Sequence, residues 1–151
     1  FGAGGRPILN DDNAYVAGGM IVARLPDRAD LDLPGAVGTI RARLTDFHFT
    51  AQMVGDGTSL TSAALTGRWP YSDMLMFLDD LGICPGTPMT ALILAGFAVV
   101  LSRSMDVRAT PGTGGPGVMC DAISTVFPFQ NAARVSLGGI VPIVLEPNAC
   151  P

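Results

Sequence analysis

The stretch "VGTIRARLTDFHFTAQMV", residues 37–54, contains a reversal in its apolar pattern that decides the fold. Up to Leu44 the even-numbered positions are apolar, whereas from Phe47 onward the odd-numbered positions are apolar. Side chains of a strand point alternately to its two faces, so the reversal needs one extra residue. We therefore predict one long strand that is interrupted by a β-bulge or a short break near Thr45-Asp46.

The residues on either side of this stretch predict further strands. Gly55-Asp56-Gly57 is typical of a tight hairpin, because glycine and aspartate tolerate positive φ, and a return strand is expected over 59–69. Upstream, residues 14–25 predict a strand with a turn or bulge at Gly18-Gly19. Residues 26–34, bracketed by two prolines and rich in aspartate, predict a loop.

A first helix is predicted over residues 71–82, "YSDMLMFLDDLG", where the apolar residues recur at helical spacing. Ser72 or Asp73 is expected to cap its N-terminus. Gly82 is expected just past its end, where a left-handed residue commonly terminates a helix.

A second helix is predicted over residues 88–101, "PMTALILAGFAVVL", the most apolar stretch of the chain. Thr87 suits the N-cap and Pro88 the first helical position, where its missing N–H is harmless. The apolar run from Ala91 to Leu101 is about half of the roughly twenty residues that cross a bilayer. We therefore expect a core helix or an oligomer contact, and no transmembrane segment.

After a flexible loop over residues 110–117, "TPGTGGPG", closing strands are predicted over 120–131, 132–137 and 140–147. The fold class expected from this order is α+β, mainly antiparallel, as a sandwich or a partly open barrel. Two consecutive helices separate the strand blocks. The chain has 151 residues, which suits a single β-rich domain spanning residues 1–151.

The composition indicates a large buried interface. Apolar residues make up 48% of the chain and the mean hydropathy is +0.41, while charged residues make up 15%, against roughly 25% on average. A protein partner or a homo-oligomer is therefore expected. The nine basic residues are all arginine, which excludes a Schiff-base or phosphate-loop lysine. The net charge is −4 without a basic patch, so nucleic acid is not an expected partner.

Asp46 and His48 are the residues of this sequence that most resemble a reactive pair. Two residues apart on one strand, they would share a face, as a general base with its partner carboxylate or as half of a metal site. The alternative is a solvated polar face opposite the apolar face of Phe47 and Phe49. With a single histidine, no GxSxG elbow and no metal-ligand motif, we favour the polar face and predict no catalytic, cofactor-binding or metal site.

The chain has three cysteines and no CxxC motif. Cys84 and Cys120 frame the second helix, and we predict a structural disulfide between them, with two reduced, buried thiols as the alternative. Closing the intervening loop would stabilise the fold by about 4 kcal/mol on the chain-entropy view. A disulfide implies an oxidising compartment outside the cytoplasm. Cys150 would then pair with a segment absent from this chain or with another subunit.

Two motifs carry a resemblance to a family. They are the corner Gly67-Arg68-Trp69-Pro70 with Asp73, and the run Cys120-Asp121-Ala122-Ile123-Ser124. With the order of segments over residues 14–151, they resemble an uncharacterised group of secreted or lipid-anchored proteins from high-GC, gliding soil bacteria. The resemblance implies a C-terminal portion of a longer precursor and implies no activity. The helix at 88–101 is more apolar than that group leads one to expect.

Taken together, these features predict a non-enzymatic structural or interaction domain that is secreted, periplasmic or at the cell surface, as a subunit of a surface assembly. One alternative is a carrier that binds an apolar small molecule, a lipid or a pigment, between the sheet and the helices. Another, which we disfavour, is a hydrolase-type enzyme that uses Asp46 and His48.

Overall fold

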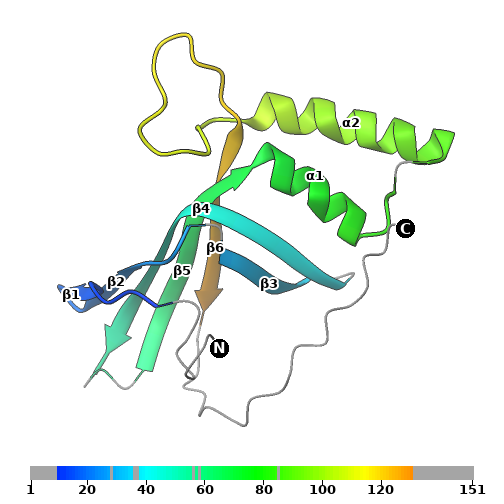
Figure 1. The fold of residues 1–151 in the computed structure, drawn as a ribbon. Helices are drawn as coiled ribbons and strands as arrows, with labels where there is room; N and C mark the ends of the chain where they lie inside the picture. The colour runs from blue at the N-terminus through cyan, green and yellow to red at the C-terminus, as the bar shows by residue number, and fades with distance from the viewer. Residues whose placement is uncertain are drawn as a thin grey trace.

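The computed structural model describes residues 10–27, 29–35, 38–55, 57, 59–84 and 86–130. The elements, in chain order, are β1 (Tyr15–Ala17), β2 (Met20–Arg24), β3 (Ala29–Gly35), β4 (Gly38–Val54), β5 (Ser59–Pro70), α1 (Tyr71–Asp80), α2 (Pro88–Ser104) and β6 (Ala122–Gln130). The strands form one open antiparallel sheet in the order β1-β2-β4-β5-β6, with β3 also paired to β4 (Figure 1). The expected α+β class with two consecutive helices is confirmed. The strands predicted at 132–137 and 140–147 lie outside the described residues.

The strand predicted over residues 14–25 is a β1–β2 hairpin that turns at two glycines. Gly18 and Gly19 have φ values of 57° and 78°, a left-handed pair that matches the twist of the flanking strands. The Asp11 carboxylate accepts hydrogen bonds from the backbone N–H of Asn13 at 2.8 Å and of Arg24 at 2.6 Å. These bonds hold the segment before β1 against the end of β2.

The predicted bulge lies in β4. Pairing with β5 is regular at Thr45 and resumes at His48, so Asp46 and Phe47 together lie opposite one residue, Gly67. Asp46 has a φ of 50°, in the left-handed region that aspartate tolerates better than most residues. Two residues facing one is the definition of a bulge, and the prediction near Thr45-Asp46 is confirmed.

The bulge keeps one face of β4 apolar along its whole length. Ala42 and Leu44 are fully buried before it, and Phe47 and Ala51 are buried after it. Even-numbered residues therefore give way to odd-numbered ones on the core side, as the reversed pattern predicts. Leu31 of β3 joins this cluster, and the partly buried side chains packed against it are Leu25, Leu65, Trp69 and Phe127.

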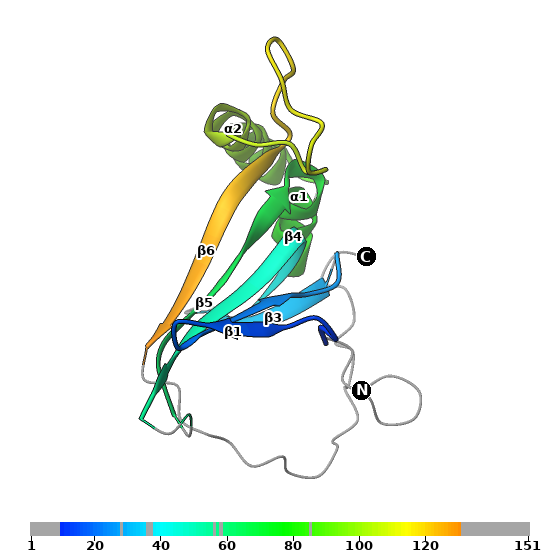
Figure 2. The ribbon, with the colours of Figure 1, turned by 90° about the vertical axis from the view of Figure 1, so that its left-hand side faces the viewer.

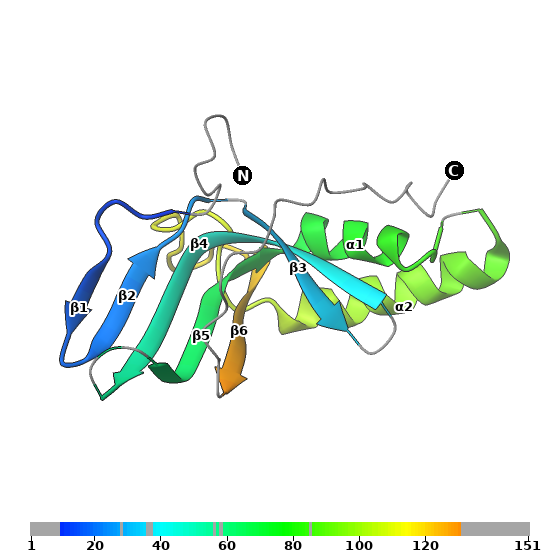
Figure 3. The same cartoon turned by 90° about the horizontal axis from the view of Figure 1, so that it is seen from below.

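The loop predicted over residues 26–34 is wrong, because β3 occupies most of it. β3 pairs with β4 in continuous register from Ala29 opposite Leu44 to Gly35 opposite Gly38. Aspartate and leucine alternate in this stretch, which is a strand pattern, and Pro34 is tolerated because an edge strand can lack one N–H. Seen from below, β3 and the start of β4 reach past the other strands toward the helices (Figure 3).

The first helix begins directly where β5 ends. Pro70 occupies the N-cap position and no side chain caps the helix, so the expected caps Ser72 and Asp73 are wrong. Both fall inside the first turn because no loop separates strand from helix. The predicted end is confirmed: Gly82 has a φ of 74° and donates its N–H to the carbonyl of Asp79 at 2.9 Å.

Helix α1 forms the layer between the sheet and α2 (Figure 1). Met74 and Leu78 are buried, and α1 contacts β4, β5 and α2. The Trp69 ring lies 6.0 Å from that of Phe77 and 6.4 Å from that of Phe127, centroid to centroid. Trp69 therefore links α1 to the sheet through aromatic contacts, which add about 0.5–1.5 kcal/mol each beyond area burial.

The second helix begins as predicted. The Thr87 hydroxyl accepts from the N–H of Thr90 at 3.2 Å, and the Thr90 hydroxyl accepts from the N–H of Thr87, so both residues form a capping box. Pro88 occupies the first turn. Within the described part of the chain, no helix is both long enough and apolar enough to cross a membrane.

Candidate functional site

The exposed helix α2 is the most unusual surface of the described structure. None of its 17 residues is buried, although most are apolar. Met89, Leu92 and Val100 are 68%, 70% and 62% exposed. An apolar helix is normally buried on every side, and a contiguous apolar patch commonly marks an interaction site. We name the α2 surface away from α1 the outer face, formed by Met89, Leu92, Gly96, Val99, Val100 and Arg103.

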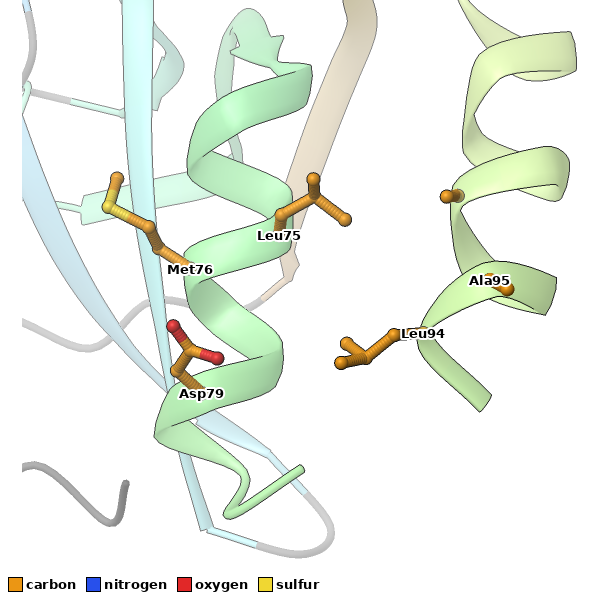
Figure 4. Close-up of a pocket in the computed structure, with 6 residues that line it drawn as sticks. Leu75, Met76, Asp79, Leu94 and Ala95 are labelled. Carbon is orange, nitrogen blue, oxygen red and sulfur yellow. The ribbon is translucent and has the colours of Figure 1, made fainter. Parts of the chain in front are cut away.

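The opposite side of α2 meets α1 along an open groove. The groove has a volume of about 420 Å³ and is lined by Leu75, Met76, Asp79, Leu94, Ala95 and Ala98. Leu75 of α1 and Leu94 of α2 point toward each other across it (Figure 4). The lining is apolar apart from the Asp79 carboxylate. This groove lies between the two helices, whereas the carrier hypothesis placed a pocket between sheet and helices.

The predicted pair Asp46 and His48 is separated by the bulge. The Asp46 carboxylate accepts from Arg68 Nε at 3.1 Å, lies 3.0 Å from Arg68 Nη2 and 3.7 Å from Arg24. The His48 ring instead donates from Nδ1 to the backbone carbonyl of Asp46 at 2.9 Å. The carboxylate thus serves an arginine pair and does not orient the imidazole, so this geometry gives no support to a hydrolase-type site.

Arg68, which pairs with Asp46, also holds the base of the loop formed by residues 105–121. Arg68 Nη1 donates to the carbonyl of Arg108 at 3.0 Å, and Arg108 pairs with Asp121 at 2.9 Å. Asp121 also accepts from the N–H of Ala109 at 2.6 Å. The loop projects beyond the sheet (Figure 2), so these bonds fasten it to the bulge at its root. These contacts give a structural role to four charged side chains, Asp46, Arg68, Arg108 and Asp121.

Two aspartates have shifted pKa values. The pKa of Asp106 lies below its usual 3.8 because its carboxylate accepts from the Ser124 hydroxyl and from the Ser124 N–H, the latter at 2.7 Å. The pKa of Asp11 is lowered by the N–H groups of Arg24 and Asn13. Hydrogen bonds to the charged form are the cause in both cases. Both carboxylates join segments of the fold.

Among the residues that the structure describes, no group of three or more His, Cys, Asp or Glu side chains is placed to hold a metal ion. Asp46, considered with His48 as half of a metal site, instead pairs with Arg24 and Arg68.

The predicted disulfide between Cys84 and Cys120 is wrong. Cys120 is a half-buried free thiol, whereas Cys84 is disulfide-bonded. The two cysteines are therefore not bonded to each other. The cause is α2, a rigid spacer of about 25 Å at 1.5 Å per residue. Cys84 precedes its first turn. The bridge between Val107 and Ala122 keeps Cys120 near its last turn. The expected behaviour of Cys150 lies outside the described residues.

The sequence left open whether the helix over residues 88–101 is a core helix or an oligomer contact, and none of the residues of α2 is buried in the structure. The helix is apolar all round, so its pattern gives no side that must be buried and none that must be exposed. The polar pair Asp46 and His48 drew attention in the sequence, but Asp46 and its neighbours have a structural role, because they hold the 105–121 loop. No family model matches the chain, and no curated protein and no solved structure matches it either.

Proposed function

We propose that this chain is a non-enzymatic structural or interaction domain, a subunit of a surface assembly, that binds a protein through the outer face of α2. The observation that carries the proposal is a mostly apolar helix of 17 residues, none of which is buried. Leaving such side chains in water is costly, since each Leu or Val gains about 1.5–3 kcal/mol on full burial. A partner that covers them recovers part of this free energy.

The capping and composition of α2 support a role in binding. The helix is capped by Thr87 and Thr90 and begins with Pro88, so it is well formed before any partner arrives. Its outer face has one charge, Arg103, at its end. A rigid, preformed apolar ridge loses little conformational entropy on association.

The proposed compartment is outside the cytoplasm. A disulfide at Cys84 supports it, because disulfides persist mainly in oxidising compartments. The resemblance to secreted or lipid-anchored proteins of gliding soil bacteria, carried by Gly67-Arg68-Trp69-Pro70 and Cys120-Asp121, points the same way.

The proposal is tested by position-specific photo-crosslinking in the cells that make the protein. A photoreactive residue replaces Leu92 on the outer face, and the matched control replaces Thr113 in the 105–121 loop, which is also exposed. We expect protein adducts at Leu92 that are absent at Thr113. Equal or no protein adducts at the two positions would reject a protein-binding role for α2.

A second candidate function is a carrier for an apolar small molecule, favoured by the groove between α1 and α2. Its volume of about 420 Å³ lies in the range of small-molecule sites, and its walls are apolar. Mass spectrometry of an organic extract of the purified protein tests it, with Ala98→Trp as the variant that fills the groove. A ligand present in the wild type and lost in Ala98→Trp supports the carrier, and an empty wild-type extract refutes it.

A further inference from the structure

Strand β6 lies at one margin of the sheet (Figure 2). Its nine residues, AISTVFPFQ, include no charged side chain, and Val126 is 62% exposed. The outward N–H and C=O groups of an edge strand are a template on which another strand can add. Uncharged segments rich in β-branched and aromatic residues add to one another most readily. The composition and position of β6 therefore both favour strand addition.

The register of β6 shows which of its backbone groups face outward. β6 pairs with β5 in one continuous antiparallel register, without a bulge. In such a strand the N–H and C=O groups of successive residues point alternately to its two sides. Ala122 and Ser124 donate their N–H groups to residues outside β5. The backbone positions of Val126 and Pro128 therefore face outward as well.

The segment that follows α2 occupies the first part of this edge. The N–H of Ala122 donates to the carbonyl of Val107 at 3.1 Å, and the carbonyl of Ala122 accepts from the N–H of Asp106 at 3.2 Å. The Asp106 carboxylate accepts from the N–H of Ser124 at 2.7 Å and also from the Ser124 hydroxyl. A carboxylate oxygen thus takes the place that a carbonyl of an incoming strand would occupy.

Pro128 closes the next part of the edge by lacking a donor. Proline has no N–H, and the register puts its nitrogen on the outward side. A proline is tolerated within β6 for this reason, because no hydrogen bond to β5 is lost. Among the residues that the structure describes, Val126 is the one outward position from Ala122 to Pro128 whose N–H exists and has no partner.

We propose that Asp106 and Pro128 block the outer edge of β6, so that another strand cannot add to the sheet there. Asp106 lies two residues after the end of α2 at Ser104, so the helix and the hydrogen bonds to Ala122 fix its position. Its carboxylate brings a charge to an edge that has none of its own. Covering that charge with a second strand would be costly. This block is independent of the partner that binds α2.

Restoring the missing donors tests the block. In the double variant Asp106→Ala/Pro128→Val, the N–H of Ser124 becomes free and position 128 gains an N–H. On incubation of the concentrated full chain, thioflavin T fluorescence and the infrared band of intermolecular β-sheet should both rise several-fold above the wild type. The matched control Asp12→Ala/Pro116→Val makes the same two changes at exposed positions outside β6 and should behave like the wild type.

Lower stability also promotes association, so its effect is measured separately. Ala51→Gly removes a buried methyl group from β4 and leaves the edge of β6 intact. It is compared with the double variant at urea concentrations that leave equal fractions folded. Under these conditions the double variant should associate faster. Equal rates would assign the effect to lost stability and overturn the block.

Two further results decide the matter. A double variant that is folded by circular dichroism and shows neither signal overturns the block. If the double variant does not fold, Pro128→Val alone decides, because it removes no hydrogen bond and should still show a smaller rise than the one expected of the double variant; no rise in this variant overturns the block. Association through α2 would raise the mass without raising either signal, so it does not interfere.

Discussion

Replacing Gly67 by alanine should destabilise the protein, and the structure indicates by how much. Gly67 faces the two bulge residues of β4. A Cβ built there lies 3.0 Å from Leu44 Cβ, 3.1 Å from Leu44 Cδ1 and 3.2 Å from the carbonyl oxygen of Thr45. Leu44 is fully buried and the carbonyl belongs to the backbone, so neither neighbour can move aside freely.

Two opposing effects set the magnitude. Overpacking of this kind costs about 1–3 kcal/mol. Replacing glycine by alanine also removes disorder from the unfolded chain, which stabilises by about 0.4–1 kcal/mol. The contacts with Leu44 and Thr45 are tight and rigid, so we expect the overpacking to dominate. The net loss in the free energy of unfolding should be about 1–2 kcal/mol.

Urea unfolding followed by circular dichroism measures this loss, with Gly96→Ala as the matched control. The control makes the same chemical change at an open helix position, where it should stabilise by about 0.8–1.0 kcal/mol. The two variants should therefore move in opposite directions. A Gly67→Ala protein as stable as the wild type would refute the contact with Leu44.

Three further predictions follow from the core, the carboxylates and the cysteines. Phe47→Ala should lower the free energy of unfolding by about 3–5 kcal/mol because Phe47 is fully buried, whereas Tyr15→Ala at a 58% exposed site should change it little; equal losses would contradict the assigned core. Asp106 has a lowered pKa, so its charged form stabilises the fold at neutral pH and that contribution is lost as pH falls below about 3.8. Asp106→Asn should therefore be less stable than the wild type at pH 7, by urea unfolding, and the difference should shrink in acid; a constant difference would exclude a role for the charge. In non-reducing peptide mapping, Cys120 should react with an alkylating reagent after denaturation and Cys84 should not; a peptide linking Cys84 to Cys120 would contradict the structure.

The local features of the fold could be predicted from the sequence because each depends on neighbouring residues. The bulge followed from a reversed alternation near Thr45-Asp46, and the capped start of α2 followed from Thr87-Pro88. The glycines at the hairpin turns adopt the positive φ values that their positions suggested, for example 64° at Gly55. Period, cap and turn chemistry are encoded within a few residues.

Features that depend on distant parts of the chain could not be predicted. β3 is a strand because β4 offers it an edge, although Pro26 and Pro34 favoured a loop. The pairing of Cys84 with Cys120 failed although the helix between them was predicted, because the positions of cysteines in the sequence do not show which thiols the folded chain brings together. The same holds for α2, whose apolar residues predict burial equally well within the chain or against a partner.

The bulge in β4 has a consequence for changes in chain length. One residue deleted between Thr45 and Phe47 would remove the extra position, and the second half of the strand would turn its polar side chains toward the core. One residue added there would do the same. Insertions and deletions at this point should therefore be far more damaging than in the exposed loop over residues 110–117, which is the natural place to insert an affinity tag.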